Sequence, residues 1–273
     1  MVIKESERVK PSHFVLVHGL CHGAWNWFKL VPLLKSEGHR VSAIDLAASG
    51  VRTAESLSEV HTFRDYSQPL LDLLASLPEE EKVILVGHSL GGLNLALAME
   101  AFPEKISTAV FVTAFMPDCS SPPSSVLKQY FTMTPPDTLL DTLFTTPEKH
   151  KTVVLFGPNC LSLRFYHNCS PEDLSLGLLM LRPGSLFLED LSASPNLSEE
   201  KYGSVPRVYI VCKEDKGIPE EFQQWMIKNN PPEMVMEIQG ADHMPMLCKP
   251  NHLSLSLLKV ANTYLGTVHT HAH

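Results

Sequence analysis

The stretch Val83–Gly92, with the sequence VILVGHSLGG, constrains the fold of this chain more than any other. Its apolar start indicates a buried strand, which runs into the pentapeptide Gly87-His-Ser-Leu-Gly91 and then into a helical pattern. A G-x-S-x-G turn between a strand and a helix is typical of a nucleophile elbow. Such a tight turn requires small residues two positions before and after the serine, and the helix directs its N-terminal dipole at it. The pattern predicts that Ser89 is a nucleophile.

A serine nucleophile needs a general base, and the base needs an orienting carboxylate. In sheets with such an elbow, the acid and then the histidine follow the serine along the chain, past the ends of later strands. His243 follows the last strand pattern and a glycine-containing loop, and Asp215 follows the preceding strand pattern. Glu214 is a competing acid, whereas Asp242 is too close to His243 in the chain to reach its ring. The predicted triad is Ser89, Asp215 and His243.

The intermediate of acyl transfer also needs an oxyanion hole made of two backbone N–H groups. In this arrangement one N–H comes from the residue after the serine, and the other comes from the loop after the first core strand. These rules assign the two donors to Leu90 and Leu20. Gly19 and Gly23 allow the first loop to fold back toward the elbow.

Strand and helix patterns alternate through most of the chain. Besides the elbow strand, we expect strands at residues 13–17, 41–46, 106–115, 207–212 and 233–239, and helices at 25–36, 66–76, 93–102, 219–227 and 252–264. Alternation of this kind predicts a parallel sheet with helices on both faces, and right-handed crossovers place the elbow strand near its middle.

The alternation stops after residue 116, where ten prolines interrupt the pattern as far as residue 202. Residues 117–202, with only short helical pieces, are therefore predicted to form an inserted cap over the serine. The predicted core comprises residues 13–116 and 203–266, and residues 1–12 and 267–273 are expected to be disordered tails. The apolar residues of the cap predict a dry pocket, and its candidate lining includes Tyr130, Phe131, Leu139 and Phe144.

Composition excludes several classes of function. The net charge of −8 and the lack of a Lys/Arg cluster argue against nucleic acid or an anionic membrane as a partner. No apolar run approaches the roughly 20 residues that span a bilayer, and the N-terminal residues lack a signal-peptide pattern, so we expect a cytoplasmic protein. The six cysteines show no zinc-binding spacing and are read as free thiols. Neither a metal nor an organic cofactor is expected.

Six motifs along the chain occur together in one known family. They are HFVLVHGLCHGAW at 13–25, IDLAASG at 44–50, GHSLGG at 87–92, YGS at 202–204, EDKGIPEEF at 214–222 and GADHM at 240–244. Together they resemble the plant methylesterase and hydroxynitrile lyase family of α/β-hydrolases, over residues 13–264. The resemblance implies an α/β-hydrolase fold with a cap, the same triad and a homodimer. It also implies a small-molecule ester substrate, of the salicylate, jasmonate, indole acetate or alkaloid type.

Two chemistries occur in this family, and neighbouring residues distinguish them. Lyases carry a threonine where this chain has Gly19, which is expected to leave room for an acyl group. They also carry a lysine where this chain has Met244, and a methionine cannot hold a departing cyanide anion. Gly19, His88 and Met244 are therefore added to the candidate lining of the pocket. The sequence thus predicts a methyl-ester carboxylesterase, with a slow, receptor-like hydrolase as the alternative and a lyase less favoured.

The acyl group itself stays open at this point. Salicylate-type esterases carry a tryptophan where this chain has Leu139, and the stretch at residues 145–152 is shorter here. Both differences fall on the expected pocket, so the resemblance does not select one acid.

Overall fold

The computed structural model describes residues 11–148 and 151–265 of the chain. Its centre is a six-stranded sheet, all parallel, in the order β2-β1-β3-β4-β8-β9. The strands are β1 His13–Val17, β2 Arg40–Ile44, β3 Val83–His88, β4 Ile106–Val112, β8 Arg207–Cys212 and β9 Met234–Ile238. The elbow strand β3 is third in this order, which confirms the predicted parallel sheet with the elbow near its middle.

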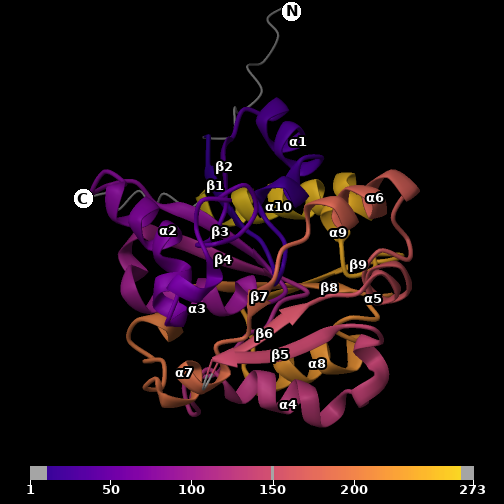
Figure 1. The fold of residues 1–273 in the computed structure, drawn as a ribbon. Coiled ribbons are helices and arrows are strands. Elements are labelled where there is room, and N and C mark those ends of the chain that lie inside the picture. The colour runs from indigo at the N-terminus through magenta and orange to yellow at the C-terminus, as the bar shows by residue number, and fades with distance from the viewer. Residues whose placement is uncertain (1–10, 149–150, 266–273) are drawn as a thin grey trace, which may run out of the picture.

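Side chains of the sheet alternate between two separate apolar cores. In β1, Val15 and Val17 belong to one core, whereas Phe14 and Leu16 belong to the other. The helices over the first core are α2 Phe63–Ser76, α3 Gly91–Ala101 and α8 Glu220–Asn229, and those over the second are α1 Leu30–Ser36 and α10 Pro250–Leu265. Figure 1 shows α2 beside α3 and α1 beside α10. Because both faces are buried, the central strands are apolar throughout.

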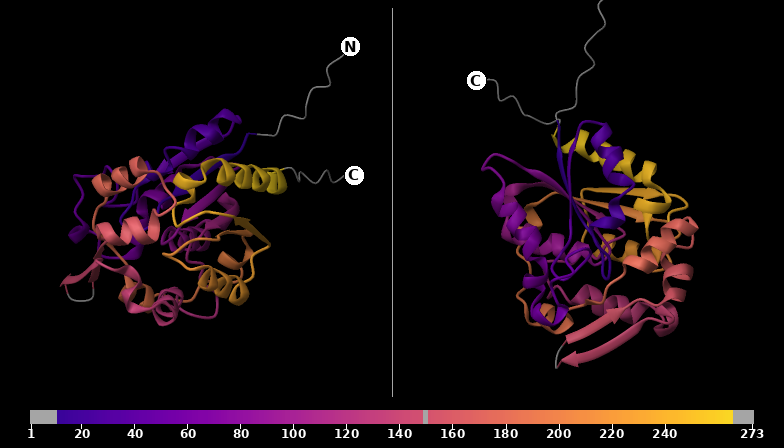
Figure 2. Two further views of the ribbon diagram at one scale, coloured as in Figure 1. Left: turned by 90° about the vertical axis from the view of Figure 1, so that its right-hand side faces the viewer. Right: turned by 45° about the horizontal axis from the view of Figure 1, so that its top comes forward.

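The segment predicted as the cap contains a second, antiparallel sheet of three strands, in the order β5-β6-β7. Its elements are α4 Ser125–Met133, β5 Leu143–Glu148, β6 Lys151–Leu155, α5 Pro158–Cys160, the π-helix Leu161–Phe165, α6 Pro171–Met180, β7 Gly184–Ser185 and α7 Leu188–Ala193. The β5–β6 hairpin lies beside α4 in Figures 1 and 2. The expectation of short helices alone is wrong here, because β5 is an edge strand and tolerates the proline that argued against a strand. The division into core and cap stays a prediction.

Several predicted boundaries differ from the structure, and two of the differences concern the N-terminal part of the chain. The helix expected at residues 25–36 is two elements, the 3-10 helix Ala24–Trp27 and α1. Pro32 lacks an N–H, and its ring would clash with the carbonyl group four residues earlier, which favours a break just before α1. Ser12, assigned to the N-terminal tail, is buried and its N–H donates to His39 Nδ1 at 3.1 Å. The rest of the predicted tails, apart from Pro11, lies outside the described residues.

The remaining short elements connect these layers. They are the 3-10 helices Leu57–Glu59, Pro103–Lys105, Pro136–Leu139 and Tyr202–Ser204, and the short helix α9 Pro245–Cys248. Within residues 11–148 and 151–265, no helix has the length and apolar character needed to cross a membrane.

Candidate active site

Ser89 lies directly after β3, in the turn that leads into α3. Its φ angle of 54° is in the left-handed region, where a residue other than glycine is strained by about 1–3 kcal/mol. A Cβ on Gly87 would lie 2.7 Å from a methyl group of Leu95, and one on Gly91 would lie 2.7 Å from the carbonyl oxygen of His18. Both positions need glycine for the turn to close, so the turn has the geometry of a nucleophile elbow.

The Asp215 carboxylate lies against the ring of His243, with 2.7 Å between Oδ2 and Nδ1. Its Oδ1 accepts hydrogen bonds from the N–H groups of Gly217 at 2.6 Å and Ile218 at 2.9 Å. Because a carboxylate only accepts, Nδ1 of His243 carries the proton. The second ring nitrogen, Nε2, is therefore the one that can take a proton from a serine.

The two other acids near His243 have different partners. Glu214 is exposed and accepts from the side-chain amide of Asn168 at 2.8 Å. Asp242 is buried and accepts from the backbone N–H groups of Asn168 and Met244. Among the described residues, Asp215 is the carboxylate that contacts the His243 ring.

Thr113 is a member of this network that the sequence analysis missed. Its hydroxyl donates to Asp215 Oδ2 at 2.5 Å. The strand expected to run to residue 115 ends at Val112, and Thr113 has a φ angle of 37°. This left-handed residue ends the strand at the point where its hydroxyl meets Asp215. The one feature of the sequence that could have indicated this role is that Thr113, a residue with a hydroxyl group, directly follows the apolar residues of β4.

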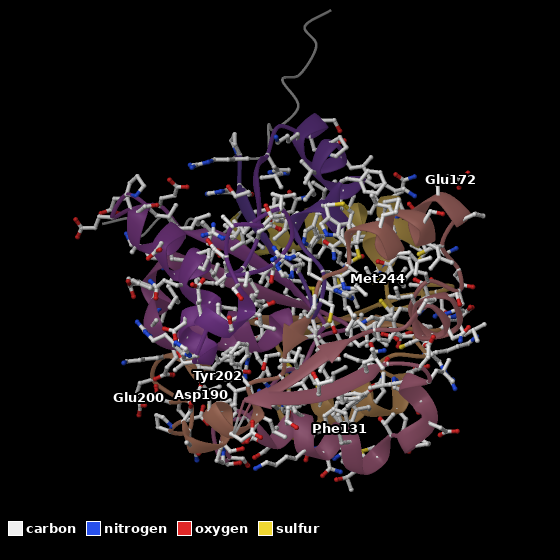
Figure 3. All side chains as sticks on the ribbon, in the orientation of Figure 1. Phe131, Glu172, Asp190, Glu200, Tyr202 and Met244 are labelled. Atoms are coloured by element: carbon white, nitrogen blue, oxygen red, sulfur yellow. The ribbon has the colours of Figure 1, made fainter. Side chains whose placement is uncertain are left out.

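Ser89 and His243 line one cavity, which is narrow and opens to solvent. The other lining residues are Leu20, Leu90, Phe115, Leu127, Tyr130, Phe131, Leu139, Phe144, Val154, Phe156, Phe165, Leu186, Gly217 and Ile218. Four predicted pocket residues from the cap segment are thus present, among them Phe131 on α4 (Figure 3). Within the part of the chain described, the lining contains no Asp, Glu, Lys or Arg.

Three other predicted pocket residues lie outside this lining. Met244 is fully buried in the second core, near α9 (Figure 3). His88 is buried beside Ser89, and its Nε2–H donates to the carbonyl oxygen of His243 at 2.6 Å. A Cβ on Gly19 would lie 2.8 Å from Ser89 Cβ. A side chain at position 19 would therefore meet Ser89, because this loop packs directly against the serine.

The two assigned oxyanion donors each follow a residue of the contact between Gly19 and Ser89, Leu20 after Gly19 and Leu90 after Ser89. Leu20 and Leu90 both line the cavity beside Ser89. In the described part of the chain, neither N–H donates to another protein atom. Two unused donors next to the serine are what an oxyanion hole requires.

Two buried histidines hold the loop that carries Leu20. His18 Nε2 accepts from the N–H of Leu46, so its Nδ1–H donates to the carbonyl oxygen of Gly19 at 2.8 Å. His22 Nδ1–H donates to the carbonyl oxygen of Leu20 at 2.8 Å, and its Nε2 lies 2.7 Å from the hydroxyl of Tyr166. The sequence analysis singled out neither histidine, although both belong to its first motif.

These histidines are neutral in the folded protein. Burial lowers the pKa of His18, and it lowers the pKa of His22 to about 3. The pKa of His88 is also well below its ordinary value, first because of burial and then because of the neighbouring His243. Neutral rings keep one donor and one acceptor each. His18 and His22 use both ring nitrogens in hydrogen bonds, whereas His88 uses Nε2 and its buried Nδ1 has no partner.

The cap segment also contacts the triad directly. The Tyr130 hydroxyl on α4 donates to the carbonyl oxygen of Gly217 at 2.7 Å, in the loop after Asp215. The ring of Phe165 lies 4.6 Å from that of His243, measured between centroids. Cap residues therefore help to hold both the acid and the base.

Comparison with known proteins gives consistent matches over almost the whole chain. A family model described as "Alpha/beta hydrolase family" matches residues 14–249. Methylesterase 1 of Arabidopsis thaliana is 55% identical over 262 residues, which cover 95% of this chain and 100% of that protein. Salicylic acid-binding protein 2 of Nicotiana tabacum is 55% identical over 256 residues, 93% of this chain and 98% of that one.

A solved structure agrees with the sequence matches. The crystal structure of polyneuridine aldehyde esterase matches with a TM-score of 0.90 at 48% identity, covering 92% of this chain and 100% of that one. The chain belongs to the alpha/beta hydrolase family, among the plant methylesterases and their esterase relatives. The predictions of an α/β-hydrolase fold and of a hydrolytic enzyme are confirmed.

Removing the Thr113 hydroxyl tests its part in the site. A hydrogen bond to a charged group is worth about 1.5–3 kcal/mol, so Thr113→Ala should lower kcat by roughly 10- to 100-fold on any ester that the protein hydrolyses. Thr113→Ser keeps the hydroxyl and should retain most of the rate. Steady-state kinetics of both variants check this, and equal rates for the alanine and serine variants would contradict it.

Acid should destabilise this protein through its buried histidines. In the unfolded chain a histidine binds a proton below about pH 6.5, whereas His22 stays neutral in the fold down to about pH 3. The unfolded state then binds more protons, so the free energy of unfolding falls with decreasing pH across this window. The slope is up to ~1.4 kcal/mol per pH unit for each such histidine.

Urea unfolding at several values between pH 7 and pH 5 measures this slope. His22→Asn should reduce the slope by up to one proton, whatever its effect on stability at pH 7. His252→Asn is the control, because His252 is exposed and should leave the slope unchanged. A slope that is identical in all three proteins would contradict the assignment.

Proposed function

We propose that this chain is a carboxylesterase that hydrolyses methyl esters of small apolar acids through an acyl-enzyme on Ser89. The proposal rests on the geometry of the site. Ser89 lines the same cavity as His243, whose ring is hydrogen bonded to Asp215. The lining described for this cavity contains no Asp, Glu, Lys or Arg. Relatives named methylesterase and aldehyde esterase support the same chemistry.

The reaction follows from the positions of these groups. Ser89 Oγ attacks the ester carbonyl while Nε2 of His243 takes its proton, and the N–H groups of Leu20 and Leu90 stabilise the oxyanion. The imidazolium, stabilised by Asp215, then protonates the departing methanol. Water attacks the acyl-enzyme in a second round of the same steps and releases the acid.

The cavity supports an apolar, ring-containing acyl group. Five phenylalanine and tyrosine side chains from the cap segment line it, namely Tyr130, Phe131, Phe144, Phe156 and Phe165. An acyl group of the salicylate, jasmonate, indole acetate or alkaloid type would pack on such surfaces. The relative named for binding salicylic acid supports an aromatic acid among these.

That same name supports the alternative of a receptor-like hydrolase that binds a free acid and turns over slowly. The uncharged lining favours the esterase, because a free carboxylate would meet no lysine or arginine among the described lining residues. A lyase is disfavoured, since Met244 lies outside the cavity and offers no charge to a cyanide anion.

The surroundings proposed for this enzyme follow from the sequence. A cytoplasmic location is supported by the six cysteines, which are all free thiols. A homodimer rests on the family resemblance alone. We propose neither nucleic acid nor a membrane as a partner.

Hydrolysis of an ester panel tests the function. The panel contains methyl salicylate, methyl jasmonate, methyl indole-3-acetate and p-nitrophenyl acetate. At least one methyl ester should turn over many times, and Ser89→Ala should lower kcat by on the order of 10⁶-fold. Ser76→Ala, at an exposed serine, is the matched control and should keep full activity.

Three results would change the assignment. Activity that survives in Ser89→Ala would show that Ser89 is not the nucleophile. Tight binding of a free acid with no turnover above the Ser89→Ala background would favour the receptor-like alternative. Reaction with the p-nitrophenyl ester alone would point to a bulkier natural ester.

The Leu139 position should control the size of the acyl group. Leu139 lines the cavity, so Leu139→Trp fills part of it and should lower kcat/KM for the bulkiest accepted ester by at least 10-fold relative to methyl salicylate. Leu178→Trp, an exposed position on α6, should leave the ratio unchanged. Ratios of kcat/KM from competition between two esters measure the effect, and an unchanged ratio in Leu139→Trp would refute it.

A further inference from the structure

Three potential metal ligands from separate segments meet beside the active site. Cys169 precedes α6, Asp242 directly precedes His243, and Cys248 is the last residue of α9. One ligand atom of each, two Sγ atoms and a carboxylate oxygen, all lie within 4.8 Å of one another. Figure 1 shows α6 and α9 next to each other at this place. The proposed ester hydrolysis uses none of these three side chains.

The separation of the ligand atoms suits a tetrahedral zinc site. Zinc binds thiolate sulfur at about 2.3 Å and carboxylate oxygen at about 2.0–2.2 Å, which puts the two ligand atoms about 3.6 Å apart. Cys169 Sγ lies 3.4 Å from Asp242 Oδ2 and 3.8 Å from Asp242 Oδ1. These two separations bracket the distance that a shared zinc ion would set between them.

The carboxylate of Asp242 is already oriented by the backbone. Its Oδ2 accepts from the N–H of Asn168 at 2.8 Å, and its Oδ1 accepts from the N–H of Met244 at 2.9 Å. The Cys169 thiol also donates to this carboxylate, and loss of the thiol proton would leave a lone pair on Asp242 for a cation. Fixed outer hydrogen bonds of this kind are typical of metal-binding carboxylates.

This carboxylate is also a buried charge without a basic partner. Asp242 is fully buried, and no described Lys, Arg or His side chain forms an ion pair with it. A buried charge is costly unless it is paired or coordinates a metal. A divalent cation would supply the missing positive charge.

The two thiols complete the set. The pKa of Cys169 is raised, first by its hydrogen bond with Cys248 and then by burial and the charge of Asp242. Without a cation, Cys169 therefore stays protonated. Both cysteines are partly exposed, so the cluster is in contact with solvent at these two side chains.

We propose that Cys169, Asp242 and Cys248 bind a thiophilic divalent cation, such as Zn²⁺, with water as the fourth ligand. The two thiols each lose one proton to solvent as their sulfur atoms bind the cation, and nothing is oxidised or reduced. The cation joins the segment before α6 to the loop that carries His243. It is a structural site, and its occupancy is independent of the proposed esterase function. The sequence prediction of no metal would then be wrong, since no spacing motif marks these ligands.

The test uses the full chain with its thiols kept reduced. His269, His271 and His273 are replaced by alanine in every sample, so that the terminal histidines cannot bind the metal. Titration with Cd²⁺ should produce a thiolate-to-cadmium charge-transfer band that saturates at one cation per chain. X-ray absorption at the zinc edge of the Zn²⁺-loaded protein should show two sulfur neighbours at about 2.3 Å. This second measurement needs no variant at the site.

Variants assign the ligands. Cys169→Ser and Cys248→Ser should each weaken Cd²⁺ binding by at least 10-fold and reduce the band, and Asp242→Asn should weaken binding by about 10-fold or more. Cys119→Ser, at a half-buried thiol elsewhere, should bind as before. Thermal unfolding without metal shows which variants are folded.

The proposal is overturned by any of three results. One is the absence of a charge-transfer band in the reduced protein. Another is a band of undiminished intensity and affinity in folded Cys169→Ser or Cys248→Ser. The third is a zinc edge without two sulfur neighbours, which would remain decisive if a variant failed to fold.

Discussion

The buried carboxylate of Asp215 is the group on which the arrangement of this site depends. Deprived of water, it needs hydrogen bonds, and it accepts them from Thr113, from the N–H groups of Gly217 and Ile218, and from His243. These donors come from the end of β4, the loop after β8 and the loop after β9. A parallel sheet brings all three segments to one edge. The hydrogen bonds of this one carboxylate therefore hold the His243 ring in the cavity that Ser89 also lines.

Neutral histidines hold the loop that carries the assigned oxyanion donor Leu20. His18 and His22 donate to carbonyl groups of the loop that carries Leu20, and His88 donates to the carbonyl of His243. Burial keeps the three rings uncharged, so each presents one donor and one acceptor. The site thus has directed hydrogen bonds without free charge, which suits an apolar ester. The same burial makes the fold sensitive to acid.

The cap segment supports the chemistry as well as covering it. Tyr166 reaches His22, Tyr130 reaches the Asp215 loop, and Phe165 packs on the His243 ring. The proposed cation site would add a further connection between this segment and the loop of His243. Substrate preference and catalytic geometry are therefore coupled, because the side chains that line the cavity come from the same elements that hold the triad.

The sequence by itself determined the parallel sheet, the elbow and the three triad candidates. These follow from apolar strand patterns and from glycines in a tight turn, which act over a few neighbouring residues. Tertiary structure decided between Asp215 and Glu214, brought Thr113 to the acid and packed Gly19 against Ser89. It also formed the β5–β6 hairpin and gathered two cysteines and an aspartate from distant segments. Local patterns cannot encode such contacts, because they depend on which loops meet at the edge of the sheet.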